Sequence, residues 1–171
     1  MTFALWLVLL ASAAAAVTDL RTRRIPNAIS LALASAGVIV SAQSGWHGVG
    51  TFAAIGIVAI VAGTPLFSLR LLGGGDVKLL AAACATLGLA QLPAFLAGTL
   101  LCGGLVGIAT AIYYKRLAAT LANVRAMALP AMTGMGLTPI SGGIKMPYGI
   151  AIFGGALVAA AVHYARLRPL L

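Results

Sequence analysis

The chain has almost no negative charge. Its 171 residues include no glutamate and two aspartates, Asp19 and Asp76, against eleven lysines and arginines, and the formal net charge is +9. In a chain that is 62% hydrophobic, a carboxylate is costly to keep near lipid and is usually retained for function. We therefore expect the two aspartates to act together, as a pair that divides the protonation states of acid–base hydrolysis between its members.

Charged residues of either sign are also scarce. They make up 8% of the chain and the mean hydropathy is +1.11, whereas a water-facing surface needs many more charged side chains. This composition excludes a soluble protein and predicts an all-α integral membrane protein, with a single domain over residues 1–171. Six apolar segments predict transmembrane helices, at about Thr2–Val17, Ala28–Gln43, Thr51–Leu69, Leu79–Leu92, Ala94–Tyr114 and Tyr148–Ala165.

Several of these segments are shorter than the roughly 20 residues that cross about 30 Å of hydrocarbon. They are rich in Ala and Gly, so we expect close helix packing and local thinning of the bilayer to compensate. The boundary between the fourth and fifth segments is placed near Pro93. The first segment does not resemble a secretory signal, because its basic cluster follows the apolar stretch instead of preceding it.

Positive charges predict the orientation of the chain in the membrane. With the N-terminus outside, nine basic residues fall in the inner connections: Arg21, Arg23, Arg24, Arg70, Lys78, Lys115, Arg116, Arg125 and Lys145. The outer side keeps only Arg166 and Arg168. This bias predicts an inner (plasma) membrane protein with both aspartates at the cytoplasmic face, since Asp19 ends the first helix and Asp76 opens the fourth. The positive charge then reflects topology and contact with anionic lipid, not a nucleic-acid partner.

Residue types that bind metals are few and scattered. Cys84 and Cys102 lie in apolar segments and form no C-x-x-C pair, so neither a zinc site nor a disulfide framework is indicated. His47, in a predicted outer loop at Ser44–Gly50, and His163, near the outer end of the last helix, lack the partners of a metal site. We expect neither a metal nor an organic cofactor.

A glycine-rich hexapeptide, Gly73–Lys78, surrounds the second aspartate. Glycines before Asp76 allow a backbone or an extended substrate to approach the carboxylate closely. The simpler interpretation is a helix cap, because Asp is favoured at the N-cap position. The two interpretations are compatible, since a helix N-terminus stabilises an ionised carboxylate.

The first aspartate lies in the basic segment Thr18–Asn27, which ends in a proline and an asparagine suited to a turn. Here the simpler interpretation is an ion pair between Asp19 and Arg23 at i,i+4, worth about 0.3–0.5 kcal/mol at an exposed helix end. A third non-spanning stretch, Lys115–Pro147, starts as a basic amphipathic segment and becomes rich in Gly, Pro and Met. The later section, Thr133–Pro147, is too interrupted for a simple helix and could enter the membrane where protein covers it.

Three motifs in this order resemble the type IV prepilin peptidases, membrane aspartic proteases of the Gly-x-Gly-Asp type. The first is carried by Asp19, Arg21, Ile25, Pro26 and Asn27, the second by Gly73, Gly75, Asp76 and Lys78, and the third by Lys145, Pro147, Tyr148 and Gly149. The resemblance implies that Asp19 and Asp76 are catalytic and that the other motif residues bind substrate or support the site. Tyr148 would form a hydrogen bond near the active site or, equally, anchor the chain at the membrane interface.

The resemblance also implies the reaction and the substrate. Two like charges a few ångströms apart do not both ionise easily, so one carboxyl would hold a proton while its partner activates water. The substrate would be a prepilin or pseudopilin with a hydrophobic N-terminal helix, cut after its short leader on the cytoplasmic side. Many members carry an additional region with two C-x-x-C pairs and N-methylate the product. Because this chain lacks those pairs, it resembles the short Flp/Tad-type or archaeal preflagellin peptidases, and we expect no methyltransferase activity.

Two other classes remain open from the sequence. A proton-coupled transporter would use intramembrane carboxylates as a relay, but both aspartates are predicted at one face and no segment is polar enough to line a path. A non-catalytic component of pilus assembly would use the aspartates only as helix caps. Substitution of either carboxylate separates these classes from a peptidase.

Overall fold

The computed structural model describes residues 2–69, 71–115, 117–118, 120–122 and 146–167. Within these residues it contains helices and no strands, which confirms the predicted all-α fold. The helices are α1 (Thr2–Thr22), α2 (Asn27–Ala42), α3 (Gly45–Ser68), α4 (Gly74–Tyr113) and α6 (Tyr148–Leu167).

Helix α4 is two helices that meet at a break. Gly88 has φ +67° and ψ 175°, a left-handed φ that glycine adopts without the steric cost of a Cβ. The six predicted segments are therefore present, but the fourth and fifth separate at Gly88 instead of near Pro93. The proline lies inside the helix that follows the break, so the conformational freedom of glycine sets the boundary and not the missing N–H of proline.

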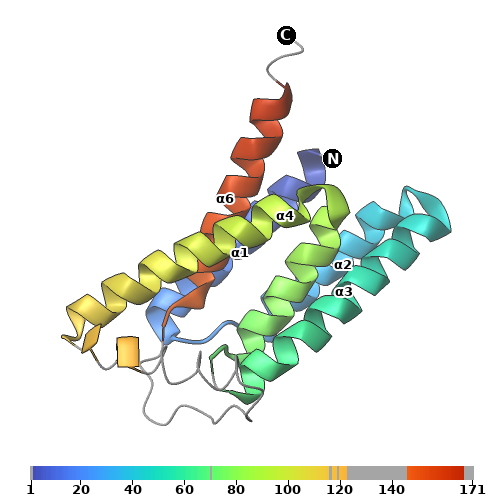
Figure 1. Ribbon diagram of the computed structural model, residues 1–171. Coiled ribbons are helices and arrows are strands. Elements are labelled where there is room, and N and C mark those ends of the chain that lie inside the picture. The colour runs from blue at the N-terminus through green and yellow to red at the C-terminus, as the bar shows by residue number, and fades with distance from the viewer. Residues whose placement is uncertain (1, 70, 116, 119, 123–145, 168–171) are drawn as a thin grey trace, which may run out of the picture.

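Successive segments run in alternate directions (Figure 1). The start of α1 and the end of α6 lie at one end of the bundle, together with the turn between α2 and α3. The end of α1 and the starts of α2, α4 and α6 lie at the other end. Sequence segments that are far apart in the chain thus share this second end.

Four of the helices (α1, α3, α4 and α6) are long and apolar enough to cross a membrane. Helix α2, at 16 residues, is about 24 Å long, less than the hydrocarbon core of about 30 Å. Helix α3 begins at Gly45, six residues before the predicted start at Thr51. The predicted outer loop at Ser44–Gly50 is therefore wrong, and His47 lies on α3, because a left-handed φ at Gly45 turns the chain sharply into the helix.

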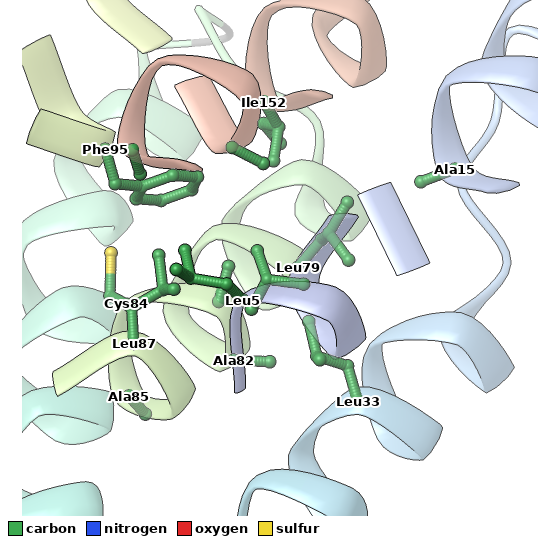
Figure 2. Close-up of a cluster of buried hydrophobic side chains, with 14 of the residues drawn as sticks. Leu5, Ala15, Leu33, Leu79, Ala82, Cys84, Ala85, Leu87, Phe95 and Ile152 are labelled. Atoms are coloured by element: carbon green, nitrogen blue, oxygen red, sulfur yellow. The ribbon is translucent and has the colours of Figure 1, made fainter. Parts of the chain in front are cut away.

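The core is built from apolar side chains of α1, α2, α3, α4 and α6. Figure 2 shows Leu5 and Ala15 of α1, Leu33 of α2, Leu79 of α4 and Ile152 of α6 in one buried cluster. Helix α4 contacts α1, α2, α3 and α6, so it forms the centre of the bundle. The packing of α4 therefore fixes the position of its first turn, which carries Asp76.

Glycines allow α4 and α6 to pack closely, as the composition predicted. A methyl group on Gly98 would meet the Val158 Cβ at 2.6 Å and the Gly155 Cα at 3.0 Å. A methyl group on Gly155 would overlap the Thr99 hydroxyl and meet the Phe95 carbonyl oxygen at 2.7 Å. Small residues at such an interface let two backbones approach each other, which holds α6 against the centre of the bundle.

Candidate active site

The three sequence motifs meet where α1 ends and where α4 and α6 begin. A methyl group on Gly75 would lie 2.9 Å from the Ile25 carbonyl oxygen, so the start of α4 packs directly against the connection before α2. A methyl group on Gly149 would lie 3.0 Å from both the Ala15 carbonyl oxygen and the Ala16 Cα. Each contact is between backbones, so these glycines set the distances between the three motifs.

Asp19 lies in the last turns of α1 and is buried, with 5% of its surface exposed. Its Oδ2 accepts a hydrogen bond of 2.9 Å from the Gly149 backbone N–H. Gly149 is in the first turn of α6, where backbone N–H groups have no partner within the helix. The carboxylate thus satisfies one of these donors and lies at the positive end of the α6 dipole.

Asp76 lies in the first turn of α4 and is partly buried. Its Oδ2 accepts a hydrogen bond of 2.9 Å from the Gly73 backbone N–H. Gly73, and not Asp76, occupies the N-cap position. The prediction that Asp76 is the N-cap residue is therefore wrong. The aspartate is the third residue of the helix, and its carboxylate reaches back to cap the first turn.

Burial is the main influence on the Asp76 carboxyl group, and the charge of Asp19 is a smaller one that acts across this junction. Tyr148, the first residue of α6, is partly buried and directly precedes Gly149, whose backbone N–H binds Asp19. Of the two roles left open for this tyrosine, a place beside the carboxyl groups is the one that its position favours. Asp19, Asp76 and Tyr148 therefore form one cluster at the junction of α1, α4 and α6.

Four other motif residues are exposed at the same end of the bundle. The Lys78 Nζ donates a long hydrogen bond of 3.5 Å to the Asn27 Oδ1, linking the start of α4 to the start of α2. Arg21, in the last turn of α1, and Pro26, directly before α2, are both exposed. These side chains are available to a ligand that approaches from this end.

The third motif is described only in part. Pro147 directly precedes α6 and is buried, so its ring helps to fix the direction in which α6 begins. Lys145 and most of the stretch 133–147, for which entry into the membrane was considered, lie outside the described residues.

Like the contact between Lys78 and Asn27, two other polar contacts were not predicted from the sequence. One is the hydrogen bond from Gly149 to Asp19, between residues 130 positions apart. The other joins the Gln91 amide and the His163 ring at 2.9 Å, near the opposite end of the bundle, where Gln91 is buried. An isolated glutamine inside an apolar segment was the available signal, because a buried amide requires a hydrogen-bond partner.

The geometry suits acid–base chemistry on one bound water. Two carboxyl groups that repel each other share a proton more readily than they ionise together, which leaves one base and one acid in the same site. Each group is held by a single backbone N–H through its Oδ2. Among the described residues, no hydrogen bond reaches the second oxygen of either carboxyl group, so this oxygen can accept one from a water or a substrate.

Comparison with known proteins identifies a family. Residues 4–108, more than half of the chain and including both aspartates, match the model of the type IV leader peptidase family. No curated protein and no solved structure matches the chain.

Proposed function

Because this chain belongs to the type IV leader peptidase family and is a membrane-integral protease, we propose that Asp19 and Asp76 are its catalytic pair. The observation that carries the proposal is the meeting of the two acidic residues of the chain at one junction of helix ends. Asp19 accepts a hydrogen bond from the start of α6, and Asp76 lies in the first turn of α4. The sequence contains no other acidic side chains that could form such a pair. The enzyme would therefore be an aspartic-type endopeptidase.

In the proposed reaction the ionised carboxylate takes a proton from a bound water, and the resulting hydroxide attacks the scissile carbonyl carbon. The protonated partner donates a hydrogen bond to the carbonyl oxygen. It then gives its proton to the departing amine as the carbon–nitrogen bond breaks. Either aspartate could begin as the base, because both accept one backbone N–H and both lie at a helix end.

The family implies a prepilin-like substrate, and we propose that it is a Flp/Tad-type prepilin or pseudopilin. Such a substrate presents a short polar leader followed by an apolar helix. Support comes from the placement of the pair at the end of the bundle, where a polar leader can stay in water while the apolar helix lies in lipid. The exposed backbone at Gly73, which bears no side chain, leaves room for an extended segment beside Asp76.

We also propose that the whole chain forms one peptidase domain that includes α6. The matched region ends at residue 108, but α6 packs against α1 and α4 and donates the hydrogen bond that Asp19 accepts. We expect no methyltransferase activity from this domain, because its sequence contains no C-x-x-C pairs.

The proposal is tested with Asp19→Asn and Asp76→Asn in liposomes that also contain a Flp-type prepilin. Asparagine keeps the size of the side chain but cannot exchange a proton, so cleavage should fall by at least about a hundredfold in each variant. The mass of the released leader gives the readout, and a thermal unfolding curve shows that each variant is folded. Near-normal cleavage by either variant would show that the two aspartates are not a catalytic pair. Proton flux that depends on the aspartates would instead indicate a transporter.

The orientation requires a separate test. We propose that the N-terminus is outside the plasma membrane and that the site faces the cytoplasm, since nine basic residues fall on that side and two on the other. A reporter joined after Arg24 or Lys78 should therefore behave as cytoplasmic, and one inserted beside Trp46 as external. The opposite pattern would place the carboxylates outside the cell and contradict cleavage of a cytoplasmic leader.

A further inference from the structure

Ser30 of α2 has a buried hydroxyl without a partner. The residue is 5% exposed, and among the described residues its Oγ is the only buried side-chain N or O atom that lacks a hydrogen bond. Other buried helical hydroxyls bond to the carbonyl one turn earlier, as Ser12 does to Val8 at 2.6 Å. The equivalent carbonyl for Ser30 belongs to Pro26 and accepts the Ile29 N–H at 3.1 Å instead. A polar group buried in this way costs stability, so its presence requires an explanation.

Ser30 and Asp19 lie at the same end of the bundle, on either side of one connection. The connection 23–26 joins α1 and α2, which run in opposite directions and contact each other. Asp19 lies four residues before this connection and Ser30 four residues after it. In an antiparallel pair of helices, two residues equally far from a short connection lie at about the same level along the helix axes. Both side chains are 5% exposed, so each is on the buried face of its own helix.

We propose that Ser30 is a positioning residue for Asp19, whose hydroxyl donates a hydrogen bond to a buried water that in turn donates to the Asp19 Oδ1. The inference rests on the proposed role of Asp19 in the catalytic pair. A water between two polar groups is nearly as good as a direct hydrogen bond, and it gives the Ser30 hydroxyl the partner it otherwise lacks.

The bridge would complete the support of the carboxyl group. Gly149 holds the Oδ2 from the side of α6, and a single hydrogen bond leaves the group free to rotate about it. A second donor from α2 fixes the plane of the carboxyl group. Since misplacement of a reacting group by about 1 Å costs roughly a hundredfold in rate, this support should act on kcat and not on substrate binding.

The test compares Ser30→Ala, Ser30→Val and Ser30→Thr in the liposome cleavage assay. Threonine and valine have the same shape and differ in the hydroxyl. We expect kcat to fall about tenfold in the alanine and valine variants, with KM within about twofold, and to recover most of its value in the threonine variant. Ser12→Ala is the matched control, because Ser12 is also a buried serine but its hydroxyl is bonded within α1. Its kcat should not change.

The outcomes separate this inference from the proposed function. If Asp19→Asn is inactive while Ser30→Ala and Ser30→Val cleave at the normal rate, Ser30 has no positioning role and the aspartate pair stands. Threonine as slow as valine would also overturn the inference, since the hydroxyl would then make no difference. If Asp19→Asn retains cleavage, both proposals are wrong. A thermal unfolding curve for every variant ensures that a lower kcat is not a loss of folded protein.

Discussion

Asp19 and Asp76 each accept one backbone N–H at 2.9 Å, but the donor for Asp76 is three residues away in the chain and the donor for Asp19 is 130 residues away. The carboxylate of Asp76 is held as soon as the first turn of α4 forms, because the capping hydrogen bond is part of that turn. The carboxylate of Asp19 is held only after α6 has packed against α1. The two halves of the site therefore depend on different levels of structure, one local and one tertiary.

This difference has a consequence for assembly of the site. Helix α6 follows the region that matches the family model, which ends at residue 108. Its first turn nevertheless brings both Gly149 and Tyr148 to the carboxyl groups. A chain in which α6 is displaced would keep Asp76 capped and would lose the support of Asp19, so the tertiary half is the more vulnerable one.

The largest effect is expected from Gly149→Ala. The new methyl group would lie 3.0 Å from the Ala15 carbonyl oxygen and the Ala16 Cα, and backbone atoms cannot move aside as a side chain can. We expect α6 to shift away from Asp19 and cleavage to fall by at least about a hundredfold, with a loss of about 1–3 kcal/mol in the free energy of unfolding. Cleavage of the prepilin and denaturant unfolding in micelles provide the measurements.

Gly104→Ala is the matched control for that variant. Gly104 is also a helical glycine, and a methyl group there meets nothing within 4 Å. Activity and stability should stay close to those of the wild type. Equal activity of the two variants would show that the contact between α6 and α1 does not control the site.

The sequence predicted the local half of the site better than the tertiary half. A glycine-rich segment before an aspartate predicts a helix start with a capping carboxylate. Asp76 does cap the first turn, but from the third helical position, and Gly73 is the N-cap residue. No local pattern relates Gly149 to Asp19, because the contact arises from the packing of α6 on α1. The order of the motifs indicated that these segments belong together but not which atoms meet.

The same contrast holds for the fold. Long apolar runs predicted the helical segments, because their composition is enough to place them in a membrane. The break at Gly88 and the start of α3 at Gly45 depend on backbone conformations that glycine permits but does not require. Proline was the more conspicuous signal, and Pro93 nevertheless lies within a helix.

A smaller effect is expected from Gly75→Ala, in the local half. The methyl group would lie 2.9 Å from the Ile25 carbonyl oxygen and 3.2 Å from its Cβ, so the connection before α2 must move. Because this connection is short and mostly exposed, it can yield more easily than α1 can. We expect cleavage to fall by at least about tenfold, with normal expression of the protein.

Gly74→Ala supplies the control within the same hexapeptide. Its methyl group would lie 3.4 Å from the Phe67 ring, which is an ordinary contact with a side chain. Cleavage should remain within about threefold of the wild type, since a flexible neighbour absorbs the contact. Equal and small losses of cleavage in the two variants would show that the hexapeptide only starts a helix. The close contact between Gly75 and Ile25 would then not matter for activity.

The smallest effect concerns stability alone and compares the two aspartates directly. Asparagine keeps an acceptor for the backbone N–H and alanine removes it, so the difference between the two variants isolates the hydrogen bond. At Asp19 the donor is buried, and an N–H left without a partner costs about 1–3 kcal/mol. At Asp76 the contact is exposed, so water can replace the lost acceptor, and the difference should stay below about 1 kcal/mol. Denaturant unfolding of the four variants in micelles measures both differences and does not depend on activity, which all four should lack. Equal differences at the two positions would mean that Asp19 is no more dependent on tertiary packing than Asp76, and the division of the site into a local and a tertiary half would be wrong.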